Sequence, residues 1–259
     1  SGTSDTPITW RAAPGEAVRI LGGRFLDPTR WLPVTDVEVL DRLDPAARQH
    51  VRQCDLRAQG ISDFGAFGSR GFGRGIVGAP LELFIDDQPM DLAQWPAPGT
   101  FTTITGFTKT MTNEWGFPNG DLAGGFTYDG DRPKHWAAND DLWVHGYWAY
   151  DWANSYEKVA RLDVKNRTVE TVAPHGHYHF ATGQRFYFLN ILEEVNAPGR
   201  WYLDRARGIL YVWPNGDLSK LESLVSELRA PLLSFNDVSH VRIEGLIIEG
   251  GRGSGISII

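Results

Sequence analysis

Residues 185–214 place the strongest constraint on the fold, because short apolar segments alternate there with residues that favour tight turns. Residues 185–189 alternate aromatic and aliphatic side chains, and the Asn-Ala-Pro-Gly sequence at 196–199 is typical of a turn. Gly208 can adopt the positive φ that closes a hairpin between residues 201–203 and 209–213. This stretch therefore predicts three short strands, two of them joined in a hairpin.

The composition of the chain extends this prediction to a mainly β fold. Its 259 residues include 29 glycines and 15 prolines. Such a composition favours many short strands joined by tight turns. Residues 80–95 and 156–172 alternate around turn residues and predict two further hairpins. Residues 36–53 have helical spacing and predict one or two short helices.

The charge and hydropathy of the chain argue against a nucleic-acid partner and a membrane partner. The formal net charge is -7, and no basic stripe is present that could displace counterions from nucleic acid. No apolar run approaches the roughly 18 residues of a membrane span. The single cysteine, Cys54, excludes an intrachain disulfide. We therefore expect neither a nucleic-acid partner nor a membrane partner.

A glycine-rich segment at 60–80 contains the spacing of a dinucleotide-binding fingerprint at residues 73–78. That fingerprint requires a strand before it and a helix after it, whose amino terminus receives the pyrophosphate. Here a glycine-rich loop precedes it, and Pro80 leads into a predicted strand. The segment is therefore interpreted as a surface loop, and no cofactor is expected.

Two segments resemble parts of right-handed parallel β-helix proteins of the bacterial carbohydrate-degrading type. Residues 7–23 contain Pro-Ile-Thr, an aromatic residue, Arg-Ala, Pro-Gly-Glu, Val and Gly-Gly in the order found in an early rung. Residues 186–211 contain a leucine, a glutamate pair, Pro-Gly, Trp-Tyr-Leu-Asp, Gly and Leu-Tyr in order. The chain departs from the family at Gln94, where an arginine is expected.

The resemblance implies three regions. Residues 1–24 are expected to form an early β-helix rung, residues 25–230 an inserted β-rich domain of sandwich or barrel type, and residues 231–259 a further rung. Residues 241–259 place aliphatic side chains between glycines, which is typical of a stacked coil. We expect the two ends to stack, and the last rung to be truncated because its aliphatic residues need a further rung to cover them.

By the same resemblance, the chain is the N-terminal portion of a secreted or periplasmic carbohydrate-active protein. The implied activity is glycoside hydrolysis of a polysaccharide or oligosaccharide, with polysaccharide lyase as the less favoured enzyme class. The catalytic carboxylates would then come from rungs outside this span, so no catalytic residue is assigned here. The alternative is a non-catalytic glycan-binding or structural β-module.

The predicted carbohydrate contacts are Trp148, Asp151 and Trp152, with His145 nearby. Sugars stack their C–H faces on aromatic rings, and their hydroxyl groups need convergent donors and acceptors. On an ideal strand His145 shares one face with Trp143 and Tyr147, whereas Trp148 lies on the other face; Gly146 could introduce a bulge that resets this alternation. We expect at least one of the two tryptophans to be accessible. The alternative is that the aromatic residues form a core.

Three histidines, His175, His177 and His179, alternate in a second polar stretch. Such spacing could present three imidazoles to a metal ion from one face of a strand. No cysteine or carboxylate accompanies them at ligand spacing, and Gly176 favours a turn. We therefore predict that they do not hold a metal.

Overall fold

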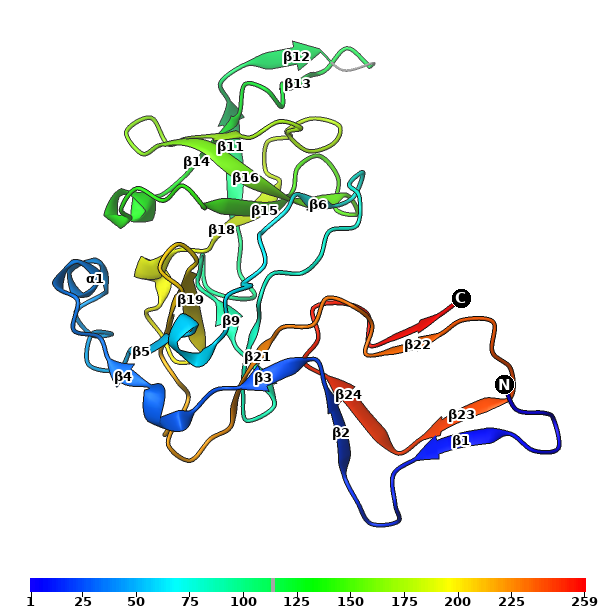
Figure 1. Ribbon diagram of the computed structural model, residues 1–259. Helices are drawn as coiled ribbons and strands as arrows, with labels where there is room; N and C mark the ends of the chain where they lie inside the picture. The colour runs from blue at the N-terminus through cyan, green and yellow to red at the C-terminus, as the bar shows by residue number, and fades with distance from the viewer. Residues whose placement is uncertain (113–114) are drawn as a thin grey trace.

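The computed structural model describes residues 1–112 and 115–259, and these residues form a mainly β protein (Figure 1). The strands are accompanied by the α-helix α1 (Val37–Arg42), which is capped by the side chain of Asp36. The short 3-10 helices are η1 (Pro28–Arg30), η2 (Arg57–Gln59), η3 (Arg132–His135) and η4 (Leu192–Glu194). Figure 1 shows a barrel, a group of smaller sheets beside it, and a separate set of paired strands that contains both chain ends.

Six strands close into the barrel. In order around it they are β18 (Arg185–Leu189), β11 (Thr102–Phe107), β14 (Phe126–Tyr128), β17 (Thr168–Thr171), β16 (Asn154–Asp163) and β15 (Trp143–Tyr147), which pairs again with β18. The short strands β10 (Gln94–Trp95) and β6 (Arg70–Gly71) pair with β18 and β16. The alternation along β18 turns Phe186 and Phe188 inward, where both are 0% exposed. Burial of these aromatic rings stabilises the barrel.

Two smaller sheets share a second core beside the barrel. One sheet contains β4 (Leu32–Pro33), β5 (Arg52–Asp55), β20 (Ile209–Val212), β19 (Arg200–Asp204) and β9 (Asp91–Leu92). The other contains β3 (Gly23–Phe25), β21 (Ser223–Ser226), β7 (Leu83–Ile85) and β8 (Gln88–Pro89). Trp201 of β19 lies in the core between them. A separate hairpin, β12 (Thr110–Thr112) with β13 (Pro118–Gly120), extends from the barrel.

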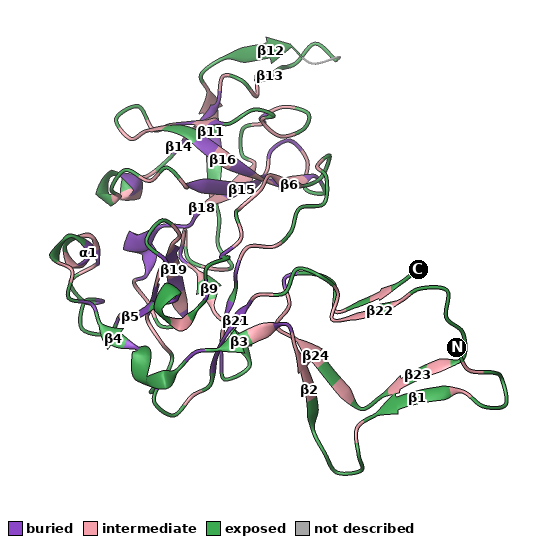
Figure 2. Cartoon of the chain, in the orientation of Figure 1, coloured by how far each residue is buried: buried purple, intermediate pink, exposed green. Residues whose placement is uncertain are grey.

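The two ends of the chain pair with each other through parallel strands. β1 (Ile8–Arg11) pairs with β23 (Val241–Glu244), and β2 (Val18–Leu21) pairs with β24 (Leu246–Glu249). A further parallel pair joins β22 (Leu233–Phe235) and β25 (Ile256–Ile258). Figure 2 shows that these end strands are mostly exposed or intermediate, whereas buried residues gather in the barrel and the smaller sheets. The expectation that the two ends stack is confirmed by these pairings.

Glycines allow the close approach at the corners of these strands. Gly245 and Gly250 have φ of 67° and 71°. A Cβ on Gly22 would lie 2.6 Å from the Cα of Gly251, so a side chain at this contact would force the two strands apart.

The prediction of a mainly β fold is confirmed. The division of the chain at residues 24 and 230 stays a prediction.

The hairpins expected from the sequence are confirmed. β19 pairs with β20 around Gly208, whose φ is 76°. β7 pairs with β8 through Asp86 and Asp87, which have φ of 52° and 61°, as the two central residues of a primed turn require. β16 pairs with β17. Within 36–53 only α1 is an α-helix; residues 45–50 form turns, because the chain must extend again at Arg52 to enter β5.

Candidate functional site

The strand β15 determines which predicted contact residues face outward. It pairs with β16 in unbroken register from Trp143 to Tyr147, so Gly146 introduces no bulge. Val144 points into the barrel core and is 0% exposed. His145 and Tyr147 therefore lie on the outer face of the barrel, as period-two alternation requires.

A row of four side chains crosses this outer face. Arg70 of β6 is opposite Tyr156 of β16, Tyr156 is opposite His145 of β15, and His145 is opposite Tyr187 of β18. The guanidinium carbon of Arg70 lies 3.6 Å from the centre of the Tyr156 ring. The His145 ring lies 4.3 Å from that of Tyr156 and 4.9 Å from that of Tyr187. The two tyrosine hydroxyls are 3.3 Å apart. This outer row therefore combines aromatic faces with hydroxyl and guanidinium donors.

His145 is almost fully covered in this row. Its Nε2 lies 3.2 Å from Oδ1 of Asn154, and its Nδ1 has no hydrogen-bond partner among the described residues. Burial lowers the pKa of His145 to about 4, and the positive charges of Arg70 and Arg185 act in the same direction, whereas the contact with Asn154 opposes them. The imidazole is therefore neutral at physiological pH.

Acidification should destabilise the protein through this histidine. The unfolded chain has the ordinary pKa of 6.5 and the folded protein a pKa of about 4, so the unfolded chain binds more protons between these values. The free energy of unfolding should fall as the pH decreases across this interval, by at most about 3 kcal/mol from His145. Urea denaturation at a series of pH values measures this slope. His145→Phe should make the dependence of the free energy of unfolding on pH less steep. An equal slope in the wild type and the variant would show that His145 is not its source.

A second row on the same face leads to Asp151. Asn154 is opposite Tyr147 in the pairing of β16 with β15. The guanidinium carbon of Arg185 lies 3.9 Å from the centre of the Tyr147 ring, and Arg185 also forms an ion pair with Asp151. The Asp151 side chain remains 70% exposed. This predicted contact residue can thus accept hydrogen bonds from a ligand while Arg185 holds it in place.

An aromatic rim, exposed except at the half-buried Tyr150, borders this face. We use this name for Phe72, Tyr150, Trp152 and Tyr178. The rings of Tyr150 and Trp152 are stacked, with centres 5.5 Å apart and an interplanar angle of 6°. Phe72 and Tyr178 pack nearly edge-on against Trp152, at 5.0 Å and 5.6 Å. Trp152 is 60% exposed, so it is the accessible tryptophan of the predicted pair.

Trp148 has a different position, and the prediction that it contacts carbohydrate is wrong. It is 1% exposed and packs inside the barrel against Phe126 and Phe180. Its Nε1 donates a hydrogen bond of 2.7 Å to Oγ of Ser155. The physical reason is the alternation itself: Trp148 continues the inward face of Val144, and the barrel interior is that face.

The three histidines of 175–179 lie beside the aromatic rim. Nδ1 of His175 is 2.9 Å from the carbonyl oxygen of Thr171. The ring of His177 packs against Phe72, and that of His179 against Tyr150. Within 1–112 and 115–259, no group of three or more His, Cys, Asp or Glu side chains is arranged to hold a metal ion.

A cavity of about 360 Å³ lies next to the outer row, where the barrel meets the smaller sheets. Its polar lining residues are Arg70, Glu82, Asp91, Gln94, Tyr156 and Tyr187. Burial raises the pKa of Glu82, and the charge of Arg70 opposes that shift. Carboxylates, an amide and phenol groups around one cavity can recognise several hydroxyl groups at once. Tyr187 was not predicted as a site residue, although alternation in 185–189 places it on the face of the strand opposite Phe186 and Phe188.

Among the comparisons with known proteins, the search of solved structures finds a similar fold. No protein-family model and no curated protein matches the chain. A solved structure described as a glycoside hydrolase is similar to it, with a TM-score of 0.63 and 15% sequence identity over 95% of this chain. The chain spans 39% of the length of that hydrolase. At this identity the similarity shows the fold alone.

Among the described residues, no helix combines the length and the apolar character needed to cross a bilayer.

Proposed function

We propose that the chain is the N-terminal portion of a secreted or periplasmic carbohydrate-active β-helix protein, and that its barrel binds a polysaccharide or oligosaccharide. The observation that carries this proposal is the aromatic rim, where Trp152 is 60% exposed and directly follows in sequence Asp151, whose side chain is 70% exposed. A sugar ring can stack on such a side chain while its hydroxyl groups reach the carboxylate.

The proposal that the chain is part of a carbohydrate-active β-helix protein is supported by the end strands and by the structural comparison. The pairs β1–β23, β2–β24 and β22–β25 are parallel, which is the pairing between successive coils of a β-helix. A glycoside hydrolase contains a region of similar fold. We infer that the barrel forms one wall of a substrate groove in a glycoside hydrolase, with polysaccharide lyase as the second enzyme class, and that the catalytic residues come from other coils.

A non-catalytic glycan-binding module is the alternative, and the ion pair of Asp151 with Arg185 is compatible with it. The arginine holds the carboxylate in place, where it can accept hydrogen bonds from the hydroxyl groups of a ligand. Catalysis by the intact protein distinguishes the two proposals. Hydrolysis or elimination of the bound glycan supports the enzyme, and binding without turnover supports the module.

Trp152→Ala should weaken glycan binding without unfolding the protein. Loss of one stacked ring costs about 1 to 2 kcal/mol, which corresponds to about 5- to 30-fold in Kd. Because Trp152 is 60% exposed, the melting temperature should change little. The measurement is an oligosaccharide titration followed by tryptophan fluorescence.

Trp10→Ala is the matched control, since Trp10 is 61% exposed and belongs to β1 of the end strands. Figure 1 shows β1 well away from the barrel. Its replacement should leave Kd unchanged. Equal affinities of the wild type and Trp152→Ala, or equal losses in both variants, would contradict a specific role for the rim.

A further inference from the structure

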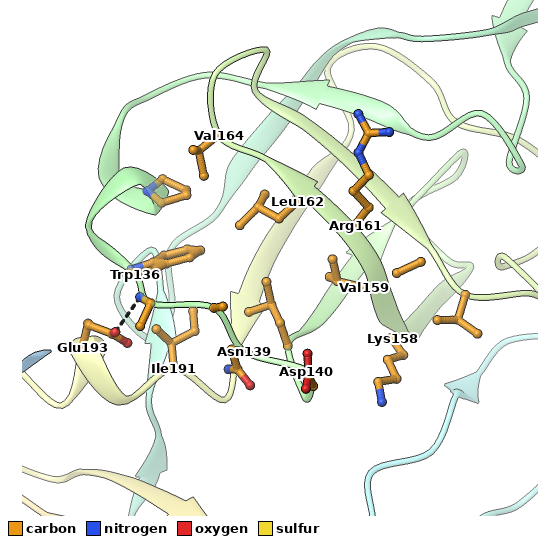
Figure 3. Close-up of a pocket in the computed structure, with 16 residues that line it drawn as sticks. Trp136, Asn139, Asp140, Lys158, Val159, Arg161, Leu162, Val164, Ile191 and Glu193 are labelled. Atoms are coloured by element: carbon orange, nitrogen blue, oxygen red, sulfur yellow. Dashed lines mark hydrogen bonds between the residues drawn. The ribbon is translucent and has the colours of Figure 1, made fainter. Parts of the chain in front are cut away.

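Two cavities border the barrel, and both have a size that is typical of small-molecule sites. The larger, of about 540 Å³, carries Lys158 and Asp140 on its lining (Figure 3). Its other charged lining residues, Arg161 and Glu193, each form an ion pair with a residue outside the lining. These charges balance, so the lining favours neither an anionic nor a cationic ligand. The smaller cavity, of about 360 Å³ next to the outer row, is lined in part by the glycine-rich loop.

Residues 75–80 of this loop run along the smaller cavity, and we call this segment the strap. In Figure 1 the chain after β6 passes from the barrel back to the smaller sheets. Val77 and Ala79 line the cavity, whereas Ile76 between them is fully exposed. The inner wall of the cavity includes Leu189 and Trp201, which are 4% and 3% exposed. The strap therefore lies between this wall and solvent.

The strap is fixed at its two ends but not between them. Before it, Arg74 forms a buried ion pair with Glu157 of β16. After it, the backbone N–H of Leu81 donates a hydrogen bond of 2.9 Å to the carbonyl oxygen of Phe64. Residues 75–80 themselves form no hydrogen bond with any residue that the structure describes. Segments with few contacts between fixed ends open at a low cost in free energy.

The glycines of the strap are not required by its geometry. A Cβ on Gly75 or Gly78 would meet no atom within 4 Å, and neither residue has a positive φ. Gly71, in β6, is different, because its φ is 113° and a Cβ there would lie 2.4 Å from the carbonyl oxygen of Asn154. Alanine would therefore fit at positions 75 and 78. Glycine at these two positions adds conformational freedom.

An apolar contact holds the strap against the first part of the loop. A Cβ on Gly68 would lie 3.3 Å from Cγ1 of Val77, so the valine side chain packs on the backbone of this glycine. Val77 remains partly exposed. Because the contact buries only part of one side chain, it stabilises the closed strap weakly.

We propose that the strap opens and closes over this cavity and controls the entry of a ligand to the outer row. The ends at Arg74 and Leu81 stay in place, so β6 remains paired with β16 when the strap opens. Opening gives access to the lining tyrosines Tyr156 and Tyr187. The identity of the ligand as part of a glycan rests on the proposed function, whereas the opening itself does not.

The reaction of a cysteine inside the cavity with DTNB, an aromatic disulfide reagent, measures this opening. Met90→Cys places a thiol at a lining position. The native Cys54 does not react, because it is buried and burial raises its pKa to about 12. The thiol at position 90 should react several-fold more slowly than one introduced by Ala13→Cys, at an exposed turn of the end strands.

Two changes in the strap should shift this rate in opposite directions. Gly75→Ala combined with Gly78→Ala restricts the open strap more than the closed one, so the thiol at position 90 should react about fivefold more slowly. Val77→Gly removes the contact with Gly68 and adds freedom, so the reaction should be about fivefold faster. The rate at position 13 and the melting temperature should not change in either background.

Hydrogen exchange of residues 75–79 is the second measurement, corrected for the intrinsic rates of glycine and alanine. Exchange should be fast in the wild type and slower in the double alanine variant. The proposal is overturned if the thiols at positions 90 and 13 react equally fast, if neither strap change alters the rate at position 90, or if both positions respond in parallel. No glycan is needed, so these outcomes are independent of the proposed function.

Discussion

Trp201→Ala should lower the free energy of unfolding by about 3 to 5 kcal/mol, which is a large share of the stability of an ordinary domain. Trp201 is 3% exposed and lies in the core shared by the two smaller sheets. Its Nε1 donates a hydrogen bond of 3.0 Å to the carbonyl oxygen of Met90. Truncation leaves both a cavity and an unsatisfied carbonyl group, and each destabilises the folded state.

Urea denaturation measures this effect, with Trp152→Ala as the matched control. The same chemical change at the 60% exposed Trp152 should cost less than about 1 kcal/mol. A loss of similar size in the two variants would show that the placement of β19 in the core is wrong.

Arg74→Met should also destabilise the protein, by about 3 to 5 kcal/mol, because it leaves a buried carboxylate without its counter-ion. Nη2 of Arg74 lies 2.7 Å from Oε2 of Glu157, whose side chain is 0% exposed. Oε1 of Glu157 accepts a hydrogen bond of 2.6 Å from Ser155, which in turn accepts one from the buried Trp148. The ion pair thus connects the loop after β6 to the interior of the barrel.

Two further variants separate this interaction from a surface ion pair. Arg161→Met removes a cation that is 61% exposed and pairs with Glu170, so it should cost less than about 1 kcal/mol. The double variant Arg74→Met with Glu157→Leu removes both buried charges, and its loss should be smaller than the sum of the single losses. Additive losses, or a small loss in Arg74→Met, would contradict the role of this pair. Both denaturation series are followed by circular dichroism.

The strands that pair through short turns could be predicted from the sequence, because local chemistry determines them. Gly208 and the Asp86–Asp87 pair accept the positive φ that their hairpins require. The closure of the barrel could not be predicted in this way. It depends on the pairing of β15 with β18, in which His145 is opposite Tyr187, and no turn residue specifies a pairing across that sequence distance.

The candidate site was predictable only in part for the same reason. Alternation along β15 separates His145 from Trp148, but only barrel closure determines which of these faces is the interior. Trp152 was predicted, whereas two of its neighbours in the aromatic rim, Phe72 and Tyr178, come from loops distant in sequence. Loop positions of this kind depend on tertiary packing, which no local pattern encodes.

Carbohydrate binding by the barrel is tested most directly by comparing the wild type with Trp152→Ala on a glycan array that includes neutral and acidic oligosaccharides. The wild type should bind a defined group of glycans, and Trp152→Ala should lose this binding while it remains folded. Asp151→Asn, which removes the charge beside the rim, should weaken binding to the same glycans. An array without signal for the wild type, or with the same signals for the wild type and Trp152→Ala, would contradict carbohydrate binding by the barrel.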